Sequence, residues 1–111
     1  MSDVDSEQLQ AIVQELQILQ SQLSQITNQV NEISLTLEAL ENQNPKKPVY
    51  RAVGNLLLEV DDIEKLRSDL ADSKTAFEGH LQRLVDREVG LRENYEEIIQ
   101  NLENYEEIIQ N

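Results

Sequence analysis

The chain has 111 residues, no cysteine, no tryptophan and a formal net charge of −13. An aromatic content of 4% is too low for a thick globular core, and the lack of cysteine excludes disulfides and thiolate metal sites. The acidic charge would repel phosphate backbones, which argues against nucleic acid as a partner. No secretory signal pattern opens the sequence and no apolar run approaches a membrane span, so we expect a cytoplasmic protein that does not bind membranes.

Residues 1–44 predict one long helix that takes part in a coiled coil. Its apolar residues alternate in steps of three and four, the spacing of a heptad seam sustained over more than four repeats. The seam consists of Leu9, Ile12, Leu16, Leu19, Leu23, Ile26, Val30, Ile33, Leu37 and Leu40. The helix must end before Pro45, because proline lacks the amide donor and disfavours α geometry in the residue before it.

Residues 45–60 predict a short basic link followed by a β-hairpin. Two β-type runs, 49–53 and 56–60, flank Gly54 and Asn55, and glycine supplies the positive φ that a primed two-residue turn requires. The cross-strand pairs expected from this turn are Val53 with Leu56, Arg51 with Leu58 and Val49 with Val60.

Both faces of this hairpin are largely apolar, yet a lone two-stranded hairpin is marginal in water and its edges are open to further pairing. We therefore expect the hairpin to complete itself against other chains. The residues predicted to form this oligomerisation surface are Val49, Tyr50, Val53, Gly54, Asn55, Leu56, Leu58 and Val60.

Residues 61–111 predict a second coiled-coil helix, which either Asp61 or Asp62 can cap, with Glu64 placed to reach back toward Asp61. The expected seam is Ile63, Leu66, Leu70, Ser73, Phe77, Leu81, Leu84, Glu88, Leu91, Tyr95, Ile98, Leu102, Tyr105 and Ile109. Two successive steps of four around Phe77 predict a stutter, which locally unwinds a supercoil.

Together these segments predict a mainly α fold, a long antiparallel two-helix coiled coil with a β-hairpin at the connecting end. The division is 1–44 for the first helix, 45–60 for the linker and hairpin, and 61–111 for the second helix. In this arrangement Leu9 faces about position 95, so that about a dozen residues overhang the first helix.

The end of the second helix contains a duplication, because residues 93–101 recur identically as residues 103–111. A period of ten fits neither a heptad nor a solenoid repeat. A duplication of the helix end without a role is the plainer interpretation, and a lengthened tip is the functional one. From Glu93 onward there are six acidic residues and no basic residue, so this end is both acidic and apolar.

The sequence contains no arrangement of residues typical of an enzyme. His80 is the only histidine, so no second histidine or cysteine can join it in a metal site. The Gly54-Asn55 pair is not followed by the glycines and lysine of a phosphate loop. Carboxylates on solvated helix faces have no cause for the raised pKa of a general acid. We expect no catalytic residue, no metal and no cofactor.

The chain resembles the beta subunits of the prefoldin family. The resemblance covers residues from about 6 to about 100 and is carried by the Gln-rich first helix, the segment 48–58 (Pro-Val-Tyr-Arg-Ala-Val-Gly-Asn-Leu-Leu-Leu) and the second heptad helix. A single hairpin and a short chain resemble the beta type and not the alpha type. The duplicated end departs from the family pattern, which leaves the length of the tip open.

This resemblance implies an ATP-independent chaperone, or holdase. It implies a hexamer of two alpha and four beta subunits, whose hairpins form a double β-barrel platform between subunits. The arm tips would capture non-native client proteins and deliver them to a group II chaperonin. The client-binding residues expected at the tips are Leu9, Ile12, Val13, Ile98, Ile99, Leu102, Ile108 and Ile109.

Two alternatives accompany these expectations. Leu9, Ile12, Ile98 and Leu102 also fit as ordinary seam residues, whereas Val13, Ile99 and Ile108 lie off the seam. The whole chain could instead be a structural coiled-coil adaptor that tethers other proteins. The hairpin separates the two functions, because a plain tether does not need one.

Overall fold

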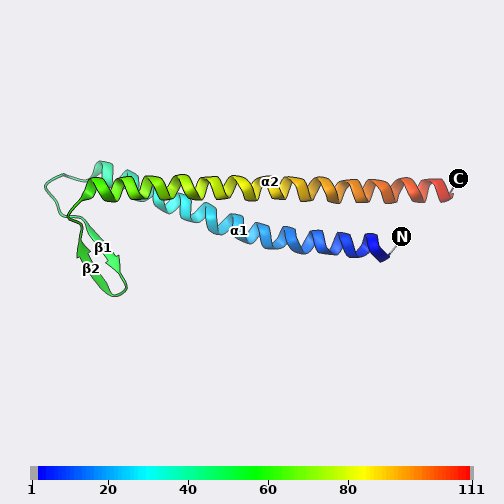
Figure 1. Cartoon of the computed structure of the whole chain (residues 1–111), viewed down its shortest axis with the longest axis horizontal. Coiled ribbons are helices and arrows are strands. Elements are labelled where there is room, and N and C mark those ends of the chain that lie inside the picture. Colours follow the sequence, from blue (N-terminus) through cyan, green and yellow to red (C-terminus); the bar gives the residue numbers. More distant parts are fainter. Residues whose placement is uncertain (1–2, 111) are drawn as a thin grey trace. The chain divides into compact units, whose positions relative to one another are not determined.

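The computed structural model describes residues 3–110, with side chains from residue 5 to residue 108. Its elements in chain order are the helix α1 (Asp3–Asn42), the strands β1 (Tyr50–Val53) and β2 (Leu56–Glu59), and the helix α2 (Ile63–Gln110) (Figure 1). The chain divides into two compact units. We name residues 1–25 with 80–111 the tip unit, and residues 26–79 the hairpin unit.

In the tip unit, α1 and α2 pack side by side in opposite directions. The buried residues of its core are Ile12, Leu19 and Leu91, and the partly buried Leu16, Leu84, Tyr95 and Ile98 pack against them. Leu9 and Tyr95 line one groove. Glu15, six residues after Leu9 on α1, pairs with Arg87, eight residues before Tyr95 on α2. The predicted antiparallel pairing of Leu9 with position 95 is confirmed.

The predicted seam of α1 is confirmed along its whole length. Each of its ten positions is buried or half-buried, from Leu9 to Leu40. Apolar residues of α1 that lie off this seam, such as Ile18 and Leu35, are exposed. The side of α1 that packs is thus set by the 3–4 spacing and not by hydrophobicity alone.

The predicted seam of α2 is wrong at Ser73. Ser73 is exposed, whereas Lys74 and Arg67 are half-buried. When Arg67 and Lys74 are counted as seam residues, the spacing between successive seam residues alternates between four and three from Ile63 to Phe77 and beyond. The seam therefore contains no stutter at Phe77. Arginine and lysine can lay their aliphatic stems along a seam while their charges reach water. A search for apolar residues alone therefore passes over them.

In the hairpin unit, α1 ends in a turn built around Pro45. The Lys47 amide donates to the Asn44 carbonyl oxygen at 2.9 Å, and the Lys46 amide donates to Asn44 Oδ1 at 2.9 Å. Proline suits the second position of such a turn because its φ is already fixed there. The predicted end of the first helix before Pro45 is confirmed, at Asn42.

The hairpin has the register that its sequence predicts. Val53 pairs with Leu56 and Arg51 with Leu58, in an antiparallel ladder. Beyond the strand ends, the Val60 amide donates to the Val49 carbonyl oxygen at 2.8 Å, which confirms the third expected pair. Each strand is one residue shorter at its outer end than predicted.

The turn of the hairpin depends on Gly54. Its φ is +58°, a conformation that L side chains rarely adopt, whereas Asn55 has no positive φ. A positive φ at the first central residue only is the signature of a type II′ turn, whose twist matches the flanking strands. The predicted primed turn is confirmed, with its type now assigned.

Asp62 caps α2. Its Oδ1 accepts a hydrogen bond from the Lys65 amide at 2.9 Å, which settles the choice between Asp61 and Asp62. With Asp62 as the N-cap, Lys65 occupies the third helical position, from which an acidic side chain could accept a hydrogen bond from the backbone amide of the N-cap residue. Glu64 instead pairs with Arg67, at 2.6 Å between Oε1 and Nη1.

Candidate interaction surfaces

The hairpin surface is exposed on both of its faces. Every residue from Tyr50 to Glu59 is exposed, and the exposed fractions of Leu56 and Leu57 are 63% and 72%. Residues alternate between the faces of a strand, so these two leucines present apolar surface on opposite sides. Exposed apolar surface of this kind marks an interaction site, and both strand edges still have unpaired backbone groups.

The predicted oligomerisation residues fall into two groups. Tyr50, Val53, Leu56 and Leu58 are exposed, and Gly54 with Asn55 forms the exposed turn. Val49 and Val60 are half-buried at the base of the hairpin. Leu57 was not among the predicted residues although it is one of the most exposed in the hairpin; its place on the second face was the signal that could have identified it.

The base of the hairpin is fixed to the two helices of its own unit. A small pocket lies there, lined by Leu40 and Pro45 at the end of α1, by Val49, and by Ile63 and Arg67 of α2. Val49 therefore packs against the helices at the base of the hairpin, and only part of its side chain is available to another subunit. The Arg67 Nε atom is buried beside this pocket without a hydrogen-bond partner.

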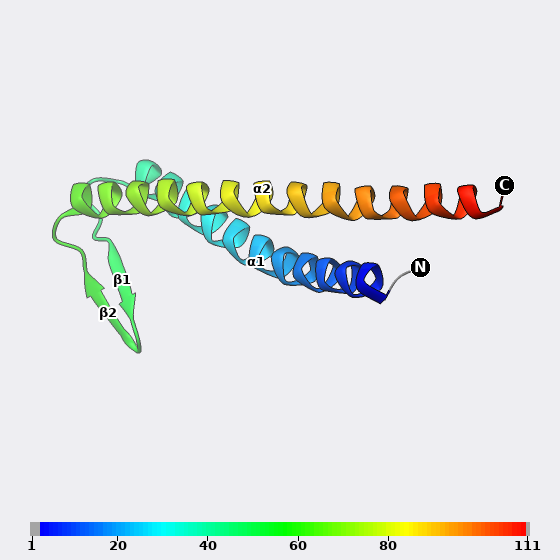
Figure 2. The same ribbon diagram turned by 45° about the vertical axis from the view of Figure 1, so that its right-hand side comes forward.

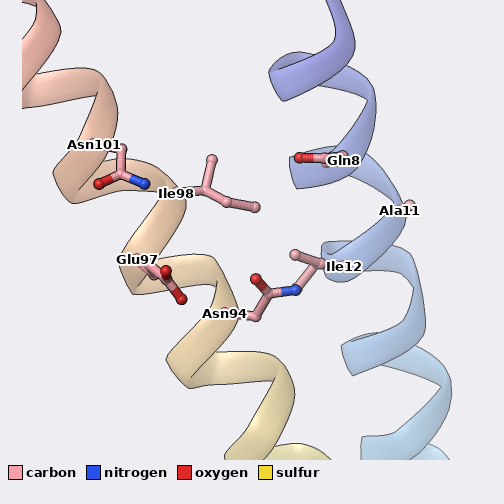
Figure 3. A pocket seen from close by; sticks show the side chains of 7 residues that line it. All are labelled: Gln8, Ala11, Ile12, Asn94, Glu97, Ile98 and Asn101. Atoms are coloured by element: carbon pink, nitrogen blue, oxygen red, sulfur yellow. The ribbon is translucent and has the colours of Figure 1, made fainter.

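A second pocket lies between the helices of the tip unit (Figure 3). Figure 3 shows Ile12 of α1 and Ile98 of α2 projecting toward each other, with Asn94 beside them. The other lining residues are Gln8, Ala11, Glu97 and Asn101. Ile12 is buried and Ile98 half-buried, so in this chain both serve the seam.

Past this pocket, α2 continues beyond the first described residue of α1 (Figure 1, Figure 2). We name residues 102–110 of α2 the overhang. Leu102 is half-buried, whereas the exposed fractions of Tyr105 and Ile108 are 57% and 74%. Tyr105 was expected on the seam and not as a client-binding residue, and no described residue of α1 covers it.

The remaining predicted tip residues differ in exposure. Val13 is exposed and lines a groove with Tyr95, and Ile99 is half-buried. Leu9 is half-buried in the seam. The backbone of Ile109 belongs to α2, but its side chain lies outside the described residues.

An ion pair joins the two helices near the tip. Both Nη2 and Nε of Arg87 contact Glu15 Oε1, at 2.7 Å and 2.9 Å. The exposed fractions of the two side chains are 59% for Arg87 and 42% for Glu15, so solvent screens the pair and it contributes more to the register of the helices than to their stability. Among the described residues, no group of three or more His, Cys, Asp or Glu side chains could hold a metal ion, and no helix is long and apolar enough to cross a membrane.

The fold defines a class of protein, a two-helix antiparallel coiled coil whose helices are joined through a β-hairpin. A family model described as "Prefoldin subunit" matches residues 5–107 of this chain. The chain therefore belongs to the prefoldin subunit family. Prefoldins are chaperones and not enzymes, which confirms the expectation of a non-catalytic protein.

Beta subunits of archaeal prefoldins are among its relatives, and the beta type is the one that the single hairpin and the short chain resemble. Prefoldin subunit beta of Archaeoglobus fulgidus is 33% identical over 95 residues, which cover 86% of this chain and 81% of the relative. The Thermoplasma volcanium subunit is 30% identical over 91 residues, covering 82% and 73%. The Sulfolobus acidocaldarius subunit is 33% identical over 99 residues, covering 81% and 77%.

A solved structure supports the fold independently. The crystal structure of the prefoldin beta subunit from Thermococcus strain KS-1 matches with a TM-score of 0.82 and 22% identity, over 92% of this chain and 89% of that chain. The predicted fold class, two antiparallel helices in contact and joined by a β-hairpin, is confirmed.

Proposed function

We propose that this chain is a holdase subunit that captures unfolded proteins at the tips of its coiled coil and delivers them to a group II chaperonin, without ATP. It acts in the cytoplasm, in a complex of two alpha-type and four beta-type subunits. The observation that carries the proposal is the exposed apolar end of α2, where Tyr105 and Ile108 extend past the pairing with α1. Exposed apolar side chains at a free helix end suit capture of many different unfolded chains.

The hairpin supplies the assembly surface in this proposal. Its apolar side chains on both faces and its open strand edges are satisfied together when hairpins from several subunits form a β-barrel. A single subunit outside the complex would leave these side chains and backbone groups exposed to water. The exposed leucines, Leu56 to Leu58, support this assignment.

The first experiment measures assembly. Light scattering gives the native mass of the chain alone and after mixing with an alpha-type prefoldin subunit, and we expect a six-chain complex only in the mixture. The double variant Leu56→Asp with Leu58→Asp should keep its helical circular dichroism and lose the complex. The matched control is Ile18→Asp with Leu35→Asp, which places the same charges on exposed apolar positions of α1.

The second experiment measures client holding. Truncation after Asn101 removes the overhang and leaves the packed seam residues Tyr95 and Ile98 in place. We expect the truncated chain to assemble normally and to lose most of its suppression of aggregation of a chemically unfolded protein. Full suppression by the truncated chain would contradict the proposal.

A structural adaptor gives a different result in both experiments. A stable dimer that ignores the alpha-type subunit would mean that the heptads pair between chains. A single folded partner bound one to one, with no suppression of aggregation, would favour a tether over a chaperone. Transfer of a held client to a group II chaperonin, followed by its refolding, tests the delivery step.

A further inference from the structure

The overhang continues the heptad seam of α2. Leu102, Tyr105 and Ile109 continue the 3–4 spacing that leads from Tyr95 through Ile98. Leu9 lies opposite Tyr95, and α1 begins six residues before Leu9, at Asp3. Gln8 also lines a pocket with Asn101, so the described part of α1 runs out opposite residues about 101 to 106 of α2. Toward this end the described residues of α1 cover α2 less and less: Leu102 is half-buried, whereas Tyr105 is exposed.

The duplication widens the apolar face of this end of the seam. Ten residues at 3.6 per turn leave the second copy rotated by about 80° from the first. Ile98 therefore lies on the seam in the first copy, whereas in the second copy the 3–4 spacing of the sequence falls on position 109, the equivalent of position 99. This rotation places Ile108 beside the seam, where it is exposed. The overhang thus presents the seam together with an apolar flank.

The charge of this end restricts what can bind the seam. Glu103, Glu106 and Glu107 lie within the overhang, three more acidic residues precede them from Glu93 onward, and no basic residue is present. Two overhangs of this kind would bring like charges together, which opposes pairing with a second copy of the chain. A cationic partner would neutralise them.

We propose that the overhang binds cationic amphipathic helical segments of non-native proteins, which lie along the α2 seam as a continuation of the place held by α1. This inference rests on the proposed function and names the class of client segment that the tip prefers. A helix is favoured over an extended segment because a heptad seam accepts side chains that recur with its own period. Lysines or arginines that flank the apolar stripe of the client meet the glutamates of the overhang.

The test uses three fluorescent peptides of about 21 residues, or three heptads. One has leucines at seam positions and lysines beside them, the second has glutamates in place of the lysines, and the third is a scrambled form of the lysine peptide. Anisotropy is measured with the assembled complex. We expect the lysine peptide to bind at least about tenfold more tightly than either of the others, and its affinity to fall between about 50 and about 300 mM salt.

Two variants locate the binding site. Leu102→Asp with Tyr105→Asp should weaken binding of the lysine peptide by at least about tenfold. Replacing Glu103, Glu106 and Glu107 by glutamine keeps the apolar face and the helix propensity, and should remove most of the preference for lysine over glutamate peptides. Ile18→Asp with Leu35→Asp is again the matched control and should change neither.

The outcomes separate this inference from the proposed function. Equal binding of the lysine and glutamate peptides overturns the role of charge, and equal binding of the lysine and scrambled peptides overturns the role of the seam. Binding that survives both overhang variants also refutes the inference. In each case, loss of aggregation suppression on truncation after Asn101 would leave the holdase function standing.

Discussion

Alanine in place of Gly90 and of Gly54 makes the same chemical change in two opposite backbone settings. A Cβ at Gly90 meets no atom within 4 Å, and the residue lies in the interior of α2 without a positive φ. The change should stabilise the chain by about 1 kcal/mol, the difference in helix propensity between the two residues. A Cβ at Gly54 is equally free of neighbours, but its φ of +58° should cost about 1 to 2 kcal/mol in strain.

The two effects need different measurements, because one acts on a helix and the other on a local turn. Urea unfolding followed by circular dichroism at fixed protein concentration should give a higher midpoint for Gly90→Ala. Amide hydrogen exchange at Val60, which donates to Val49, should be faster by roughly 5- to 30-fold for Gly54→Ala. Effects of the same sign on stability at both positions would refute the reasoning from φ and open space.

Three further changes test the helix contacts by the same urea assay. Asp62→Ala should cost about 1 kcal/mol through loss of the cap, whereas Asp61→Ala should change stability by less than about 0.5 kcal/mol. A double-mutant cycle of Glu15→Gln and Arg87→Gln should give a coupling of about 0.2 to 1 kcal/mol that shrinks in high salt; a coupling independent of salt would contradict a surface pair. Glu88→Leu should stabilise the seam by about 1 kcal/mol, since the Glu88 side chain is only 24% exposed; a lower midpoint would show that its contact with Arg92 matters more.

The parts of the fold that the sequence predicted are those set by short-range rules. The α1 seam follows from one uninterrupted 3–4 pattern of apolar residues. The helix end follows from Pro45, and the hairpin register from Gly54 together with the length of the turn. In each case the determinants lie within a few residues of one another along the chain, so no knowledge of tertiary contacts is needed.

The errors occurred where tertiary packing overrides polarity. Arg67 and Lys74 occupy seam positions of α2 that a search for apolar residues assigned differently. Leu57 and Tyr105 were left out of the predicted surfaces, because their exposure depends on what does not cover them. No described element covers Leu57, and no described residue of α1 covers Tyr105. Whether neighbouring elements cover such a residue can be judged only when the lengths and pairing of the elements are known.

The two exposed apolar surfaces differ in what they require of a partner. A helix forms its backbone hydrogen bonds within itself, so the overhang exposes only side chains such as Tyr105 and Ile108 and can remain unoccupied between clients. The hairpin exposes side chains and the unpaired N–H and C=O groups of both strand edges. Partners that satisfy those groups must be strands in a fixed register. Permanent assembly is therefore expected at the hairpin and reversible capture at the helix end.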